Sequence, residues 1–463
     1  MRLLVLFSLL SLTAVCGAQA VDKAAGAQDA SKSADAQLSP EAAYEHAAAP
    51  VDITHRDVAN WSDIELTALS VAIDQAKTAC IEREQVKYTG DDLMGYAKLC
   101  ALGQMWPDVY RAATQYINSG DKERPLLPQA YSFEVQADLN MRQPKDALGA
   151  SIAMLKVVPY CAVVDDVTTA AVRYMQFSAT EDAYELLMTR QRVLLGLLRG
   201  AQPDVGDWPT EPTVSPIPLH TVVQHALDYA ALSQYMGSKF ATGIVKDIDG
   251  AMPKDLPPDE AILIAAERRQ YDLLGTKMPE LKGAVSLMGA AEAPLAKPVF
   301  GAVTVFLLFP PWCAQCVRLG PQLQPAMERE HGSSGLKVYA LLADTPPEPP
   351  KRVAGKGAAD ASARKRTGPA AEHVAEESAV KSPADLLRKT PTLVVPPSTL
   401  DVFGAADFPF LIATDHDGVI RLLYPAAPNN ALVEGGIVDQ MTLDILSHWP
   451  LQRPKPSGSP VVH

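Results

Sequence analysis

The stretch VTVFLLFPPWCAQCVRLGPQL, residues 303–323, decides the fold of the C-terminal part of this 463-residue chain. Its first seven residues, Val303 to Phe309, form one continuous apolar run. Such a run is typical of a strand that is buried on both faces of a parallel sheet. Two prolines end the run, and a helix is expected at 321–330. A strand, a turn and a helix in this order predict a mixed α/β domain.

Further strands are expected around this stretch. Short apolar runs occupy residues 335–343, 393–395, 410–414 and 419–423. Asp417-Gly418 separates the last two runs, and it predicts the tight turn of an antiparallel hairpin. With a last helix expected at 439–449, the α/β domain is predicted to span 276–450. A disordered insertion rich in Ala and Pro is expected at 345–390, and a flexible tail at 451–463.

Cys313 and Cys316 form a C-x-x-C pair where the strand passes into the helix. A cysteine at a helix N-terminus faces unpaired N–H groups and the positive end of the helix dipole. Both stabilise the thiolate and lower the thiol pKa, so we expect Cys313 to be the attacking sulfur. Cys316, one turn further into the helix, would resolve a mixed disulfide by attacking Cys313.

Residues 303–323 resemble the strand, active-site turn and helix of the thioredoxin family, most of all the exported bacterial TlpA-like thiol-disulfide oxidoreductases. A second stretch, FPFLIATDHDGVI at 408–420, resembles the family's Pro-strand-Asp-x-Asp-Gly-x-Ile block. The resemblance implies a thioredoxin fold for 276–450, with Pro409 as a cis-proline that faces the cysteine pair. It also implies that Trp312, Phe408 and Pro409 contact the substrate peptide. Because two separate stretches match, the resemblance extends to the whole predicted domain of about 170 residues.

The chain departs from the family pattern at two places. Ala314-Gln315 lies between the cysteines, where a proline is often found in the family. Leu307 occupies the position at which thioredoxin has an acidic residue that assists proton transfer. We therefore expect a redox poise and a proton-transfer route that differ from those of thioredoxin.

The predicted function is enzymatic exchange between the Cys313–Cys316 pair and a protein dithiol or disulfide. A membrane electron donor is a second candidate partner. No dissociable cofactor is implied, because the disulfide itself carries the electrons. No metal is expected either, because a structural zinc site needs two further ligands and the sequence has no second C-x-x-C or H-x₃-H. The alternative is a non-catalytic protein-binding scaffold in which the thioredoxin fold is structural.

The N-terminus predicts export to the periplasm or the extracellular space. Arg2 precedes an apolar run of thirteen residues, Leu3–Val15, and Ala18-Gln19-Ala20 is a small-x-small cleavage site. These features are typical of a signal peptide at 1–20. A lipoprotein anchored through Cys16 is disfavoured because Val15 is bulky. No other apolar stretch approaches the ~20 residues of a transmembrane helix. The net charge of −13 argues against general nucleic-acid binding.

Residues 21–57 lack periodic hydrophobicity and are expected to be a linker, and 58–275 are expected to be helical. The capping-box pattern Ser62-Asp63-Ile64-Glu65 marks the first helix. Further helices are expected at 91–105, 107–119, 128–142, 145–157, 163–177, 180–199, 218–236 and 258–274. Helix starts recur near residues 107, 145 and 181, so the region weakly resembles a tetratricopeptide-like solenoid. An irregular helical bundle is the alternative. Either arrangement would offer a surface for protein binding.

The other cysteines and the histidines carry less information. Cys80 and Cys100 could form a disulfide between adjacent helices, or these two and Cys161 could all be buried small hydrophobes. The odd count leaves at least one thiol free or intermolecular. His220 and His225 are five residues apart, which does not indicate metal chelation on a helix. His416 is expected to be solvated, and Asp415 and Asp417 to form a turn.

Overall fold

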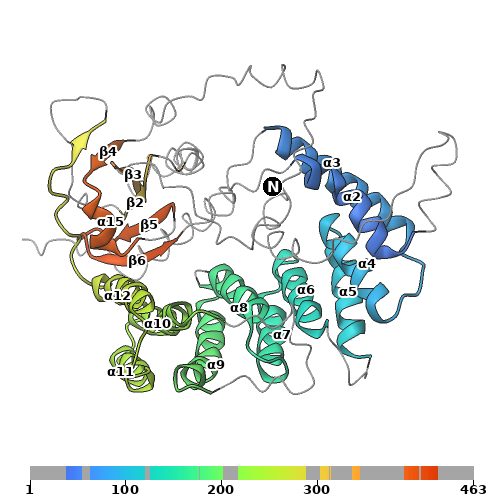
Figure 1. Ribbon diagram of the computed structural model, residues 1–463, viewed down its shortest axis with the longest axis horizontal. Coiled ribbons are helices and arrows are strands. Elements are labelled where there is room, and N and C mark those ends of the chain that lie inside the picture. The colour runs from blue at the N-terminus through green and yellow to red at the C-terminus, as the bar shows by residue number, and fades with distance from the viewer. Residues whose placement is uncertain are drawn as a thin grey trace, which may run out of the picture. The chain divides into compact units, whose positions relative to one another are not determined.

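The computed structural model describes residues 38–54, 63–119, 126–176, 178–201, 217–287, 303–311, 313, 336–344, 391–405 and 408–425. Its described residues divide into two compact units, with the boundary between Thr276 and Lys277. Helices make up the first unit, and a six-stranded mixed sheet makes up the second (Figure 1), in the order that the sequence predicts. The expected signal peptide, the insertion, the tail and the helices at 321–330 and 439–449 lie outside the described residues.

The helices of the first unit are α2 (Pro40–Thr54), α3 (Asp63–Glu82), α4 (Gly90–Leu102), α5 (Trp106–Ile117), α6 (Leu127–Asn140), α7 (Pro144–Val157), α8 (Ala162–Met175), α9 (Thr180–Leu198), α10 (Leu219–Tyr235), α11 (Ala241–Ala251) and α12 (Pro258–Leu273). The eight helices expected between 91 and 274 are confirmed, with ends that differ by at most three residues. The helix α11 was not expected.

The expectation of a linker at 21–57 is wrong for residues 40–54, which form α2. The buried side of this helix carries Ala43, Ala47 and Val51, which recur every four residues. Because two of the three are alanines, the apolar periodicity of the segment is faint, although alanine has the highest helix propensity. The helix packs against α3 and α4, and this tertiary burial stabilises it.

Successive helices pack side by side in the first unit (Figure 1), and α6 and α7 each contact both the next helix and the next but one. The α4–α5 and α6–α7 turns have the same geometry. Gln104 and Arg142 adopt left-handed φ angles of 59° and 62°. The following N–H groups, of Met105 and Gln143, donate to carbonyls five residues back. Gln104 and Arg142 are 38 residues apart, which is the spacing of the first two sequence repeats.

A disulfide joins α3 to α4. Cys80 and Cys100 are bonded at 2.03 Å and are fully buried, which confirms the cross-link between adjacent helices and excludes the all-reduced alternative. Cys161 is free and buried just before α8, and burial raises the pKa of its thiol. The unpaired cysteine expected from the odd count is therefore Cys161 among the described residues.

Close backbone approach accompanies this disulfide. A Cβ atom on Gly103, at the end of α4, would lie 2.6 Å from the backbone N of Lys77 in α3. On Gly95 it would lie 3.0 Å from the backbone N of Glu41 in α2. The two glycines thus let α4 lie directly against its two predecessors.

The sheet of the second unit has the order β1-β4-β3-β2-β5-β6. Its strands are β1 (Val285–Ser286), β2 (Val303–Phe309), β3 (Leu336–Ala343), β4 (Thr392–Val395), β5 (Phe410–Thr414) and β6 (Ile420–Pro425), and the short helix α15 (Ser398–Phe403) follows β4. The predicted buried strand is confirmed, because all seven residues of β2 are buried. It pairs in parallel with β3 and antiparallel with β5. The predicted β5–β6 hairpin is confirmed as well.

We predict that Gly103→Ala lowers the stability of the helical unit by about 1–3 kcal/mol, because the new methyl group meets backbone atoms that cannot rotate away. The matched control is Gly149→Ala in α7, where a Cβ atom meets nothing within 4 Å. That control should raise stability by about 0.5–1 kcal/mol through helix propensity. Urea unfolding measures both variants, and equal effects of the same sign would contradict the predicted close approach.

Candidate functional site

Cys313 lies directly beyond the central strand of the sheet. β2 ends at Phe309, and the N–H group of Cys313 donates to the carbonyl of Pro310 at 3.1 Å, which closes a tight turn. The Cys313 side chain is 4% exposed and is disulfide-bonded. Trp312 and Cys316 lie outside the described residues.

Phe408 and Pro409 reach the same edge of the sheet as Cys313. The peptide bond between them is cis, as expected for Pro409. Pro409 directly precedes β5, which runs antiparallel to β2 and places Phe410 opposite Leu308. The residues just before β5 therefore lie beside the end of β2, where the chain continues to Cys313. Pro409 is buried and Phe408 is half-buried.

The strand that leads to Cys313 offers no carboxyl group for proton transfer at position 307. Leu307 is fully buried, with Ala340 of β3 opposite it on one side and Leu411 of β5 on the other. An ionised acid there would be costly because it would lie inside the sheet. Any proton exchange at Cys313 therefore has to use another group.

The β5–β6 turn at the opposite end of β5 is structural, as expected for Asp415 and Asp417. Oδ1 of Asp415 accepts hydrogen bonds from the N–H groups of Asp417 and Val419, at 2.9 and 3.0 Å. Its Oδ2 accepts from Nε of Arg421 at 2.8 Å. A buried carboxylate with these donors fixes the path of the turn.

The expectation that His416 is solvated is wrong, because this side chain is 8% exposed. Its Nε2 lies 3.4 Å from Oδ2 of Asp417. Residues 277–278, at the start of the second unit, pack on this turn. The N–H group of Met278 donates to the carbonyl of Gly418 at 2.8 Å, and Nζ of Lys277 donates to the carbonyl of Asp417. The sequence pattern of a tight turn could not show that another segment packs on it.

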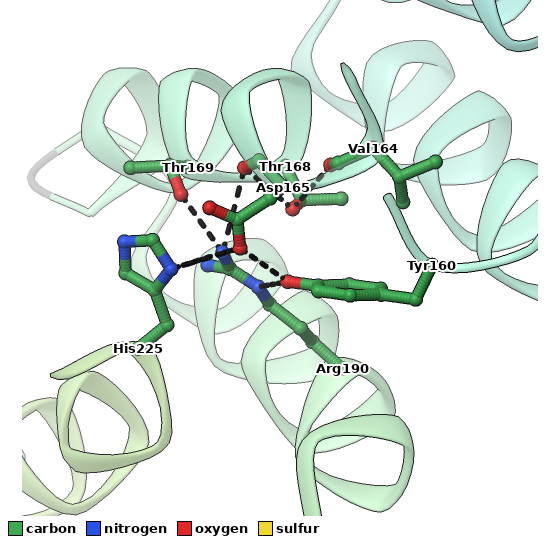
Figure 2. Close-up of polar contacts among 7 residues, drawn as sticks. All are labelled: Tyr160, Val164, Asp165, Thr168, Thr169, Arg190 and His225. Carbon is green, nitrogen blue, oxygen red and sulfur yellow. Dashed lines mark hydrogen bonds and ion pairs between the residues drawn. The ribbon is translucent and has the colours of Figure 1, made fainter. Parts of the chain in front are cut away.

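A buried polar cluster, which we call the Arg190 cluster, joins three helices of the first unit (Figure 2). It consists of Tyr160 before α8, Asp165 in α8, Arg190 in α9 and His225 in α10. Oδ1 of Asp165 lies 2.5 Å from Nη2 of Arg190 and 2.9 Å from Nδ1 of His225. The Tyr160 hydroxyl donates to the same oxygen at 2.6 Å and accepts from Nε of Arg190 at 2.6 Å.

The Arg190 cluster keeps its carboxylate ionised in spite of burial. Burial alone would raise the pKa of Asp165, but the hydrogen bond from His225 and the charge of Arg190 lower it to about 2. Burial also opposes the charge of Arg190, while Tyr160 and Asp165 raise the pKa of the guanidinium. A buried pair of this kind links α8, α9 and α10 through charge and hydrogen bonds. We therefore assign the Arg190 cluster a structural role.

Sequence reasoning missed the Arg190 cluster because its members are separated by up to 65 residues. One signal was present in α9, where Arg190 stands among the buried residues Leu186, Leu187 and Leu194. A cation on the buried face of a helix requires a partner carboxylate. The sequence could not show which acid supplies that partner.

Asp138 in α6 is a second buried carboxyl group, and it is 1% exposed. Its Oδ1 has no hydrogen-bond partner among the described residues. Burial, together with the nearby charges of Glu134 and Asp146, raises its pKa from 3.8 to about 7. The folded chain therefore binds a proton at Asp138 that the unfolded chain releases at lower pH.

Comparison with protein-family models, with curated proteins and with solved structures found no match to this chain. In the part of the chain that the structure describes, no three His, Cys, Asp or Glu side chains are grouped so as to hold a metal ion.

We predict that Arg190→Met destabilises the helical unit by about 3–5 kcal/mol, because it leaves the Asp165 carboxylate buried without its cation. The double variant Arg190→Met/Asp165→Asn removes both charges and should lose less stability than Arg190→Met alone. Chemical denaturation of the three proteins at one pH measures the difference. A double variant that is less stable than the single one would contradict the assignment of a compensated ion pair.

The raised pKa of Asp138 predicts that the stability of the fold decreases as the pH rises. Because its folded-state pKa is raised from 3.8 to about 7, stability falls as the pH rises from about 4 to about 7 and stays lower above that. Asp138→Asn should flatten this slope and melt at a higher temperature than the parent protein at pH 8. Asp91→Asn, at an exposed position of α4, is the control and should keep the parental slope. An unchanged slope in Asp138→Asn would show that Asp138 ionises as an ordinary acid.

Proposed function

We propose that this chain is an exported thiol-disulfide oxidoreductase whose second unit has a thioredoxin-like fold of the TlpA-like kind. The observation that carries this proposal is a juxtaposition at one sheet edge. Cys313 follows the end of β2, and the β2–β5 register brings the Phe408-Pro409 peptide to the same edge. Two segments almost a hundred residues apart, which both carry the resemblance to the thioredoxin family, thus lie close together there.

In the proposed reaction the Cys313 thiolate attacks one sulfur of a substrate disulfide. A new S–S bond forms to Cys313, and the other substrate sulfur leaves as a thiolate. The Cys316 thiolate then attacks Cys313, which releases the second substrate thiolate and leaves Cys313 and Cys316 oxidised. Two electrons pass from the pair to the substrate. In the reverse direction a substrate dithiol reduces the pair through the same mixed disulfide.

Trp312, Phe408 and Pro409 are the residues proposed to hold the substrate peptide beside Cys313. Phe408 and Pro409 belong to the backbone that lies next to the end of β2, and Phe408 is half-buried. The apolar rings of these residues would favour an apolar substrate segment.

The helical unit is proposed to dock the partner protein, in the manner of a tetratricopeptide-like solenoid. The repeated α4–α5 and α6–α7 turns and the stacking of α6 and α7 support this proposal. The buried Cys80–Cys100 disulfide supports the proposed export, because such bonds persist in oxidising compartments. None of the described helices is both long and apolar enough to cross a membrane.

One observation favours the alternative of a non-catalytic scaffold. Cys313 is only 4% exposed, whereas an attacking thiolate needs access to its substrate. In the scaffold the disulfide at Cys313 would be structural, and the helical unit alone would bind partners.

A trapping experiment separates the two functions. In Cys316→Ser the mixed disulfide cannot be resolved, so we predict a stable adduct between Cys313 and a partner protein that dithiothreitol releases. Cys313→Ser/Cys316→Ser is the matched control and should trap nothing. Cys161→Ala in the Cys316→Ser background should trap as before, because Cys161 is buried. Equal capture by Cys316→Ser and by the double variant would contradict thiol-disulfide exchange and favour the scaffold.

A further inference from the structure

The last described helix of the first unit, α12, is weakly buried. Of its sixteen residues only Ile264 is buried, and Ile262 is 70% exposed. Its neighbour α10 differs sharply, because nine of its seventeen residues are buried and none is exposed. Elements with few buried apolar contacts open at a lower free-energy cost than the core.

Side-chain contacts with α10 hold both ends of α12. At the start, Oε2 of Glu260 accepts a hydrogen bond from the N–H group of His220 at 2.7 Å and lies 3.1 Å from His220 Nδ1. At the end, Nε2 of Gln234 donates to the carbonyl of Leu274 at 2.9 Å. These two contacts, which we call the α12 clamps, join the first turn of each helix and the last turn of each helix.

The chain is anchored on both sides of α12. On the N-terminal side, α11 buries Ile244, Ile248 and Ala251 in the first unit. On the C-terminal side, Lys277 bridges to Val419, and the N–H group of Met278 donates to the carbonyl of Gly418 in the second unit. The helix α12 thus lies between two anchored segments of the chain.

We propose that α12 is a releasable strap, a helix that leaves α10 as one unit and thereby lengthens the chain segment between α11 and Lys277. Sixteen residues span about 24 Å as a helix and up to about 55 Å when extended. Release would therefore let this segment of the chain lengthen by up to about 30 Å while α10 and α11 stay folded. The proposal does not depend on the chemistry at Cys313.

Amide hydrogen exchange of the full-length protein tests the strap directly. We expect the amides of α12 to exchange together and much faster than those of α10. Glu260→Ala and Gln234→Ala, made separately, should each speed exchange in α12 by about 5- to 30-fold and leave α4–α6 unchanged, because each removes one clamp. Exchange of α12 as slow as that of α10 in the unmodified protein would overturn the proposal.

Matched controls separate the clamps from general helix effects. Asp259→Ala removes an acid from the same first turn of α12, and Gln224→Ala removes a glutamine from α10, but neither residue forms a clamp. Trypsin gives a second readout, because Arg268 and Arg269 lie within α12. Faster cleavage there in the clamp variants than in the controls supports the strap. Equal cleavage and equal exchange in clamp variants and controls would overturn it.

Discussion

The hydrogen bonding of β2 on both edges is the constraint on which the second unit depends. The strands β3 and β5 satisfy the backbone of β2 on its two edges, and every side chain from Val303 to Phe309 is buried on the faces of the sheet. A segment in this position has to be apolar almost throughout, since a polar group would need a partner inside the sheet. The same pairing places the start of β5 beside the end of β2, because the two strands are antiparallel and Phe410 lies opposite Leu308. The proposed chemistry at Cys313 and the position of Phe408-Pro409 both follow from this register.

The helical unit rests on a different principle, close packing of small residues with a few buried polar links. Gly95 and Gly103 allow α4 to approach α2 and α3, and the Cys80–Cys100 bond fixes one of these contacts. Further along, the Arg190 cluster joins α8, α9 and α10 through charge. The packing becomes weaker at α12, which has one buried residue and is held by polar clamps. The unit thus changes along the chain from a cross-linked end to a releasable one.

Local pattern was sufficient for most elements, and it failed where the decisive contact is distant. The apolar runs at 303–309 and 410–414 predicted strands because burial on both faces leaves a continuous signal. The sequence pattern did not predict α2, because the buried alanines of this helix resemble the composition of a linker. It did not predict α11 either, because this helix contains Gly243 and Gly250. The partner of Arg190 and the segment that packs on the β5–β6 turn are set by tertiary contacts. Spacing alone could not choose between a Cys80–Cys100 bond and reduced thiols.

The reduction potential of the disulfide at Cys313 tests the central claim most directly. The protein is equilibrated in thiol-disulfide buffers of known potential, and alkylation of each cysteine is counted by mass spectrometry. An exchange site predicts a midpoint reduction potential above about −300 mV for the disulfide at Cys313. Buffers that reduce Cys313 should then leave Cys80 and Cys100 oxidised and the fold intact, because structural disulfides have lower midpoint potentials. If Cys313 became reducible only together with Cys80 and Cys100, or only on unfolding, its disulfide would be structural and the proposed exchange would be wrong.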